Sequence, residues 1–289
     1  MKVYNCFQFF NELDILEIRL QEGWDTTDYF VIAESSHTHS GLSKEYFLLD
    51  NWERFKPYAD KIRRIQVDES IEEQRQFFPR DTNEWVREKY QRFALRNGLY
   101  DSQPDDLIII SDCDEIPRSH MIQMIKEDTN LYSRYILNIP HFHFRLNYMR
   151  VNEIKFPNIV VCRRSVFTNP MTEREYTFPW FTTPEDTVYL DHGGWQFTDF
   201  GNDEHVINKL KSFSHIDQNT SRYLDVINLE KMIANKSDRD GSDEKRFEYV
   251  VVDDYFPKCV TENLDRWKHM IIPNATVSVT DIYKIFELI

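Results

Sequence analysis

The chain has 289 residues, and its 35 lysines and arginines against 49 aspartates and glutamates give a formal net charge of −14. Hydrophobic residues make up 41% of the chain and aromatic residues 15%, which excludes an unfolded or fibrous protein. A surface with this charge repels phosphodiester backbones, so we expect no nucleic-acid partner. The sequence shows no signal peptide and no run of about 18 apolar residues. We therefore expect no transmembrane segment and a cytoplasmic location.

The first 117 residues are predicted to alternate between strands and helices. Short apolar runs predict four strands, at residues 2–7, 29–33, 62–67 and 107–110. Helical spacing predicts three helices between them, at residues 11–23, 51–58 and 83–99. Asn11 is the expected N-cap of the first helix. The fourth strand lacks polar alternation, as expected at the centre of a parallel sheet covered on both faces. The order predicts an α/β fold with a Rossmann-like, mostly parallel central sheet and helices on both faces.

Beyond Pro117 the sequence pattern changes. Strands are predicted at residues 132–144 and 159–163, and helices at 205–213 and 222–235. Two loops are predicted, a proline-containing one at 169–186 and a charged one at 236–246. No linker divides the chain. We therefore expect one domain over residues 1–289, with a nucleotide-type half at 1–117 and a half at 118–289 that supplies the acceptor side of a cleft.

The segment after the fourth strand carries three carboxylates in four residues, Asp112, Asp114 and Glu115. In an open α/β sheet, ligands bind beyond the carboxyl ends of the strands. An extended chain would point Asp112 and Asp114 to one side, where they repel each other unless a cation or a shared proton relieves them. Mg²⁺ and Mn²⁺ bind carboxylate oxygens and keep positions for substrate phosphates. The motif predicts a metal-bridged diphosphate site, and the alternative is a solvated acidic turn.

Two pairs of histidines have a spacing that zinc can use. His37 with His39, and His141 with His143, each place two imidazoles on one face of a strand. Neither pair has an evident third ligand, so we expect no structural zinc.

Several sequence blocks resemble, in order, those of glycosyltransferase family 17, which includes β-1,4-mannosyl-glycoprotein 4-β-N-acetylglucosaminyltransferases. The segment 112–117, Asp-Cys-Asp-Glu-Ile-Pro, resembles the family's D-x-D-E-I-P block. The other matching blocks lie at residues 6–14, 30–34 with 38–41, 88–92, 194–197 and 209–215. Together the blocks extend over roughly residues 2 to 275, so the resemblance covers most of the chain.

The resemblance implies a GT-A fold, a UDP-sugar donor, a divalent cation (Mn²⁺ or Mg²⁺) and an inverting transfer to a glycan acceptor. It favours UDP-GlcNAc as the donor. One alternative is the same fold with another donor, UDP-glucose or UDP-galactose. The other is a catalytically inactive carbohydrate-binding protein.

The resemblance also implies roles for residues around the donor. Asn11, Glu12 and Glu34 would lie at strand ends near the uridine, although Asn11 could merely cap a helix and Glu34 could be a surface carboxylate. Arg92 would reach the diphosphate or the carboxylate cluster, with an exposed helix arginine as the alternative. Lys209 would neutralise phosphate charge, although helix lysines are usually solvated.

His215 stands where the family has histidine. A neutral imidazole is a good Mn²⁺ ligand, so His215 is expected to complete the metal site with Asp112 and Asp114. Trp195 follows two glycines and offers a flat apolar face to a sugar ring. The alternative for Trp195 is a core position.

An inverting transfer needs a carboxylate that takes the proton of the acceptor hydroxyl. Asp191 is the favoured base because family members often carry an acid just before the Gly-Trp pair, and Asp199 and Glu204 are the alternatives. Gln196 stands where the family usually has histidine, which indicates different acceptor contacts.

Overall fold

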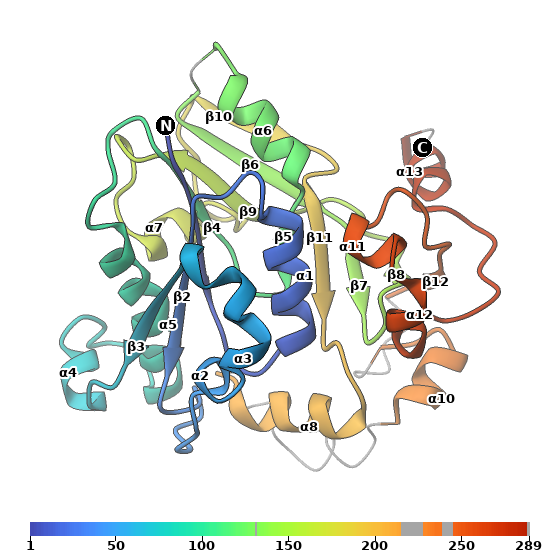
Figure 1. Ribbon diagram of the computed structural model, residues 1–289, viewed down its shortest axis with the longest axis horizontal. Coiled ribbons are helices and arrows are strands. Elements are labelled where there is room, and N and C mark those ends of the chain that lie inside the picture. Colours follow the sequence, from blue (N-terminus) through green and yellow to red (C-terminus); the bar gives the residue numbers. More distant parts are fainter. Residues whose placement is uncertain (131, 215–227, 239–244, 288–289) are drawn as a thin grey trace.

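The computed structural model describes residues 1–130, 132–214, 228–238 and 245–287 of the chain (Figure 1). Its strands form two sheets. The larger sheet has seven strands, in the order β10 (Thr187–Leu190), β6 (Arg134–Ile139), β9 (Phe156–Arg163), β4 (Leu107–Ile110), β1 (Val3–Gln8), β2 (Tyr29–Ser35) and β3 (Ile62–Val67). The smaller sheet has five, in the order β12 (Phe247–Tyr249), β8 (Tyr148–Arg150), β7 (His141–His143), β11 (Gly194–Thr198) and β5 (Glu115–Pro117).

The helices vary in length. In the first half they are α1 (Leu13–Gly23), α2 (Phe47–Asp50), α3 (Trp52–Phe55), α4 (Ile71–Arg75) and α5 (Asn83–Ala94), with 3₁₀ turns at Lys56–Lys61 and Leu95–Leu99. In the second half they are α6 (Ser119–Glu127), α7 (Pro170–Glu175), α8 (Asp203–Ser212), α10 (Leu229–Ala234), α11 (Lys258–Thr261), α12 (Leu264–Trp267) and α13 (Val279–Glu287), with a 3₁₀ turn at Lys268–Met270. Within the described ranges, no helix is long and apolar enough to cross a membrane.

The central sheet is mostly parallel, as predicted. β10 runs parallel to β6, and β4, β1, β2 and β3 are parallel neighbours. Only β9 runs antiparallel, to both β4 and β6. Because the parallel strands β1, β2 and β4 end at the same edge, the loops that follow them gather there, beside α8 (Figure 1).

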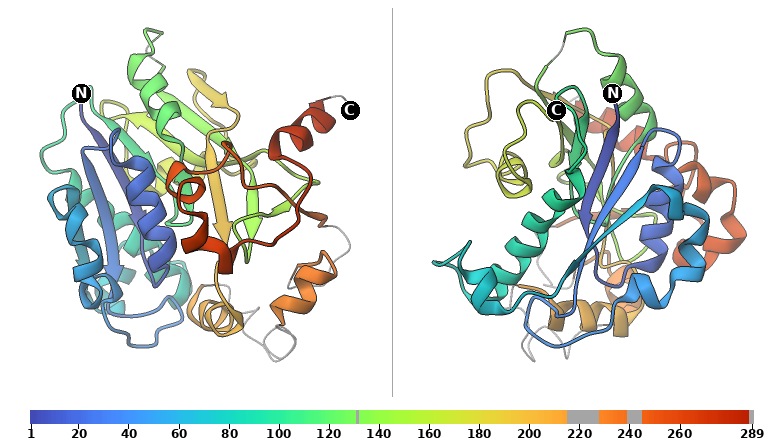
Figure 2. Two further views of the ribbon diagram at one scale, coloured as in Figure 1. Left: turned by 45° about the vertical axis from the view of Figure 1, so that its right-hand side comes forward. Right: turned by 60° about the vertical axis from the view of Figure 1, so that its left-hand side comes forward.

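Both faces of this sheet are covered. Alternate residues of β1 point to opposite faces, so Phe7 packs in one cluster with Leu16 of α1 while Cys6 packs in another with Leu95. Figure 2 shows α1 and α5 on opposite sides of these strands. The predicted α/β architecture with helices on both faces is therefore confirmed. The cluster around Phe7 also contains Trp195, so side chains from both predicted halves share it.

Most predicted elements of the first half are present. The strands predicted at 62–67 and 107–110 are β3 and β4, and those at 2–7 and 29–33 extend slightly further as β1 and β2. The predicted helix at 83–99 divides into α5 and a 3₁₀ turn.

The predicted cap of the first helix is wrong. The N-cap of α1 is Glu12 rather than Asn11, and no side chain closes this end. The side-chain oxygen of Asn11 is buried without a hydrogen-bond partner. Asn11 therefore lies in the loop before α1 without capping it.

Three predictions for the second half need correction or lie outside the described residues. The loop predicted at 169–186 contains a helix, α7, because Asn169 accepts hydrogen bonds from the amides of Met171 and Thr172 and Pro170 occupies the first turn. The smaller sheet was not predicted, since its strands have only three to five residues. Within the helix predicted at 222–235, residues 229–234 form α10, and residues 222–227 lie outside the described ranges. Residues 239–244 of the predicted charged loop also lie outside them.

Candidate active site

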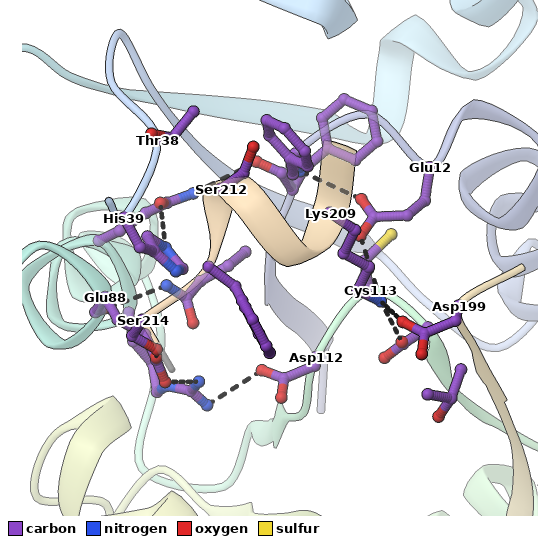
Figure 3. Close-up of a pocket in the computed structure, with 18 of the residues that line it drawn as sticks. Glu12, Thr38, His39, Glu88, Asp112, Cys113, Asp199, Lys209, Ser212 and Ser214 are labelled. Atoms are coloured by element: carbon purple, nitrogen blue, oxygen red, sulfur yellow. Dashed lines mark hydrogen bonds and ion pairs between the residues drawn. The ribbon is translucent and has the colours of Figure 1, made fainter. Parts of the chain in front are cut away.

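A cavity of about 410 Å³ lies at the edge where β1, β2 and β4 end. Its walls come from the loops that follow these three strands and from α5, β11 and α8. The lining side chains include Phe9, Phe10, Glu12, Thr38, His39, Lys44, Glu88, Gln91, Arg92, Asp112, Asp114, Gln196, Asp199, Lys209 and Ser214. Figure 3 shows ten of the lining residues with labels, gathered around one hollow. The site predicted from the strand ends is thus a real cavity.

The acidic segment after β4 is a tight turn and not an extended chain. The amide of Glu115 donates to the carbonyl of Asp112 at 3.1 Å, and the Glu115 carboxylate accepts from the amide of Asp112 at 2.8 Å. The predicted extended geometry is therefore wrong. Asp112 and Asp114 nevertheless both line the cavity, while Glu115 points into the protein with 1% of its area exposed.

A fully buried arginine of α1, Arg19, supports this turn from below. One guanidinium nitrogen donates to the carbonyl oxygens of Asp112 at 2.6 Å and Glu115 at 2.7 Å. The other donates to Ser111 Oγ at 2.7 Å. The ring of Phe7 lies 4.0 Å from the guanidinium. Arg19 was missed from the sequence, although a charged residue on the apolar face of α1 is a signal of a specific buried role.

Two further arginines neutralise the turn, Arg92 from the cavity wall and Arg174 from α7, outside the lining of the cavity. Asp112 lies between Arg92 Nη1 at 3.0 Å and Arg174 Nη2 at 3.2 Å. Although burial raises the pKa of Asp112, these guanidinium groups outweigh it and lower the pKa to about 2. Arg174 also binds both carboxylate oxygens of Glu115, at 2.7 and 2.8 Å. Arg92 is buried and not an exposed helix arginine.

Arg174 was also missed, because the prolines at 170, 179 and 184 predict a loop over residues 169–186. Its helix, α7, begins at the Asn169-Pro170 pair, which is a recognisable helix-start signal. This signal predicts a helix that carries the charged residues Glu173, Arg174 and Glu175.

On the other side of the cavity, Lys209 of α8 lies among three carboxylates (Figure 3). Its ammonium nitrogen is 3.2 Å from Asp114 Oδ2, 3.8 Å from Asp199 Oδ1 and 3.9 Å from Glu12 Oε1. Burial alone would lower the pKa of Lys209, but the carboxylates raise it well above its usual range. Lys209 is therefore a permanent positive charge in the cavity and not a solvated helix lysine.

Five of the predicted site residues thus meet in this cavity, namely Glu12, Arg92, Asp112, Asp114 and Lys209. Four others, Asn11, Glu34, Trp195 and Asp191, do not line it. The tenth, His215, lies outside the described residues.

Asn11 lines a neighbouring cavity. Glu34 is buried and pairs with Lys44 at 3.2 Å, so the alternative of a surface carboxylate is wrong. Lys44 lines the cavity, whereas Glu34 does not. His215 lies outside the described residues.

Trp195 is a core residue, which contradicts the prediction that it contacts a sugar ring. Its side chain is 1% exposed, and the indole nitrogen donates to the carbonyl of Tyr255 at 3.2 Å. Gly194 serves the packing of β11 against β5, because a Cβ there would lie 2.0 Å from the carbonyl oxygen of Ile116. The glycine before Trp195 therefore permits strand pairing and not the approach of a ligand.

Asp191, the predicted base, does not line the cavity. Its carboxylate pairs with Lys155 at 2.6 Å and accepts a hydrogen bond from Asn138 at 2.9 Å. The alternative base Asp199 does line the cavity and is 2% exposed. Glu204 is exposed and does not line it.

The donor set fits a divalent cation that also binds a phosphate ligand. No group of three or more histidine, cysteine, aspartate and glutamate side chains within the described ranges could hold a metal ion alone. Asp112 and Asp114 supply two carboxylates to one cavity. Mg²⁺ and similar ions commonly use one or two protein carboxylates and complete their shell with substrate phosphates and water.

Comparison with known proteins places the chain in a family. The profile of Glycosyltransferase family 17 matches residues 1–250. Over 132 residues, the chain is 30% identical to the β-1,4-mannosyl-glycoprotein 4-β-N-acetylglucosaminyltransferases of Rattus norvegicus and Homo sapiens. These alignments cover 43% of the chain but only 23% and 24% of the two relatives.

A solved structure, "Crystal structure of S. aureus TarS 1-349", aligns with 81% of the chain and 78% of its own length. Its identity of 9% and TM-score of 0.35 are too low to carry an argument. The family assignment rests on the profile, which spans both Asp112 and Lys209. The chain belongs to glycosyltransferase family 17.

Proposed function

We propose that the chain is a metal-dependent, inverting glycosyltransferase that transfers GlcNAc from UDP-GlcNAc to a glycan acceptor. The observation that carries the proposal is the pair Asp112 and Asp114, which both line a cavity at the carboxyl ends of parallel strands. The choice of GlcNAc rests on the names of the relatives, which are N-acetylglucosaminyltransferases.

In this proposal the diphosphate of the donor lies between the two charged sides of the cavity. Asp112 and Asp114 would hold Mn²⁺ or Mg²⁺, which supplies positive charge to the departing UDP. Arg92 and Lys209 line the same cavity and add fixed positive charge. Arg174 orients Asp112 through its pairs with Asp112 and Glu115.

The proposed base is Glu12, in place of Asp191. Both Glu12 and Asp199 line the cavity, but the Glu12 side chain is 12% exposed and that of Asp199 only 2%. In the transfer step the acceptor hydroxyl oxygen bonds to the anomeric carbon as the bond from that carbon to the UDP oxygen breaks. The bonding pair leaves with UDP, and the hydroxyl proton passes to the carboxylate.

The test measures donor binding and turnover. Calorimetry with UDP-GlcNAc, UDP-glucose and UDP-galactose, each with Mn²⁺, should show tightest binding of UDP-GlcNAc, and a chelator should abolish UDP release. Asp114→Asn removes a charge with little change of shape, and we expect it to lower the rate of UDP release by about 100-fold or more. Asp191→Asn is the matched control and should release UDP like the unmodified chain.

Each part of the proposal can fail separately. Tighter binding of UDP-glucose or UDP-galactose would refute the choice of donor. Normal turnover by Asp114→Asn would refute the metal assignment. If no UDP-sugar is bound or turned over with any metal, the result would favour the alternative of an inactive carbohydrate-binding protein.

A further inference from the structure

A second cavity, of about 340 Å³, shares Glu12 with the first. Its walls are the loop before α1, the start of α8 and the segment around Met270. Its lining combines apolar and polar side chains, among them Phe200, Met270, Asn11 and His205. A cavity of this mixed character suits a ligand with both apolar faces and hydroxyl groups.

The two cavities are lined by neighbouring residues of the same segments. His205 and Lys209 are four residues apart on α8 and so lie on the same face of the helix. His205 lines the second cavity and Lys209 the first. Likewise Asp199 lines the first cavity and Phe200, the next residue, lines the second. A ligand in the second cavity would therefore lie directly beside a donor in the first.

Two buried polar atoms of the second cavity have no hydrogen-bond partner among the described residues. They are the side-chain oxygen of Asn11 and Nε2 of His205. A buried polar atom without a partner costs about 1–3 kcal/mol, and native proteins usually satisfy such atoms. The two atoms come from different segments of the chain, and both belong to residues that line this cavity.

The charges of the second cavity argue against an anionic ligand. Its arginine, Arg54, is already paired with Asp14 at 2.6 Å and with Glu17 at 2.6 Å. Glu12 and Asp14 add negative charge to the walls. A neutral, hydroxylated ligand meets these conditions, whereas a phosphate group would find the arginine already paired with two carboxylates.

We infer that the second cavity binds a monosaccharide unit of the acceptor. Hydroxyl groups of that unit would pair with Asn11 and His205, and its apolar face would contact Phe200. Glu12, which lines both cavities, would then face the acceptor on one side and the donor on the other. Only the identification of this sugar as part of the acceptor rests on the proposed function. The binding of a neutral sugar to the second cavity can be tested without turnover.

The first experiment measures binding with the full chain and no donor. The probes are methyl β-glycosides of mannose, glucose, galactose and N-acetylglucosamine. We expect at least one of them to shift the imidazole NMR signals of His205. The shift should be lost in Asn11→Ala, and it should persist in Asn208→Ala, a control at an exposed position of the same helix. If no glycoside moves the His205 signals, the inference is wrong.

The second experiment separates the two cavities kinetically. With UDP-GlcNAc and Mn²⁺, His205→Leu and Asn11→Ala should each raise the KM of the best glycoside by about tenfold, the loss of one good hydrogen bond. UDP release in the absence of a glycoside should change less than about twofold, because the donor cavity is intact. An unchanged glycoside KM in both variants would overturn the inference. Absence of UDP release from the unmodified chain would instead count against the proposed function, and the NMR titration would still decide the sugar site.

Discussion

Two acidic segments of the chain follow strands of the same sheet, and only one reaches the cavity. Asp112 follows β4, an interior strand, while Asp191 follows β10, an edge strand. Asp112 is held between the guanidinium groups of Arg92 and Arg174, whose side chains are 7% and 11% exposed, and Arg19 binds the backbone beneath it. Asp191 pairs with Lys155, whose side chain is 44% exposed.

The place of a strand in the sheet thus decides what its last residues can do. The parallel strands β1, β2 and β4 are neighbours, so their carboxyl ends together form one wall of the cavity. β10 lies three places away from β4, beyond β9 and β6. An acid after β10 is therefore kept away from the cavity that contains Asp112, whatever its chemical suitability.

The largest effect is expected from removing the charge that holds the acidic turn. Arg174→Met leaves Glu115 buried beside Asp112 without its bidentate partner. Breaking a buried ion pair from one side costs about 3–5 kcal/mol, and we expect a loss of that size in the free energy of unfolding. Urea unfolding followed by circular dichroism measures it.

The matched control for Arg174→Met removes the cation of the other acidic segment. Lys155→Met breaks the pair with Asp191 at a half-exposed position and should cost less than about 1 kcal/mol. If Arg174→Met and Lys155→Met lose the same free energy of unfolding, the two acidic segments contribute equally to stability, and the expected difference between them is wrong.

A smaller effect is expected at Trp195 of β11, the strand that pairs with β5. Trp195→Phe loses the hydrogen bond to Tyr255 and part of the core volume, and we expect it to cost about 2 kcal/mol. The KM for UDP-GlcNAc should stay within about twofold, since Trp195 does not line the cavity. If Trp195→Phe keeps its thermal stability but has a raised KM for UDP-GlcNAc, Trp195 contacts the donor sugar as the sequence predicts.

The smallest effect is expected for Asp191→Asn. The substitution weakens a pair with a half-exposed lysine, so the unfolding free energy should fall by less than about 1 kcal/mol. Glycosyl transfer should continue at close to the normal rate. A loss of transfer by about 100-fold, with UDP release unchanged, would make Asp191 the base and remove Glu12 from that role.

Most of the central sheet could be predicted from the sequence because its strands are buried on both faces. Such strands are continuous apolar runs, and β3 and β4 occur at the predicted residues. The smaller sheet has strands of three to five residues, too short to give a periodic signal. α7 was missed because three prolines in its neighbourhood suggested a loop, although Pro170 begins the helix.

The sequence also identified the carboxylates of the candidate site, since Asp112 and Asp114 directly follow a buried strand. It missed Arg19 and Arg174, which lie 93 and 62 residues away from Asp112 along the chain. Nothing local in a sequence records which distant side chain compensates a buried charge. For the same reason the role of Trp195 was predicted wrongly: a flat ring next to glycines suits a sugar and a strand interface equally well.

The family, the α/β class and the strand that delivers the carboxylates follow from the amino-acid sequence, because they depend on local motifs and on the period of apolar residues. Which charges meet depends on the tertiary structure. It brought Lys209 to Asp114 and Glu12, paired Arg174 with Asp112, and left Asp191 outside. Charges interact through space over a few ångströms, so the composition of a site depends on the order of strands in the sheet and not on distance along the chain.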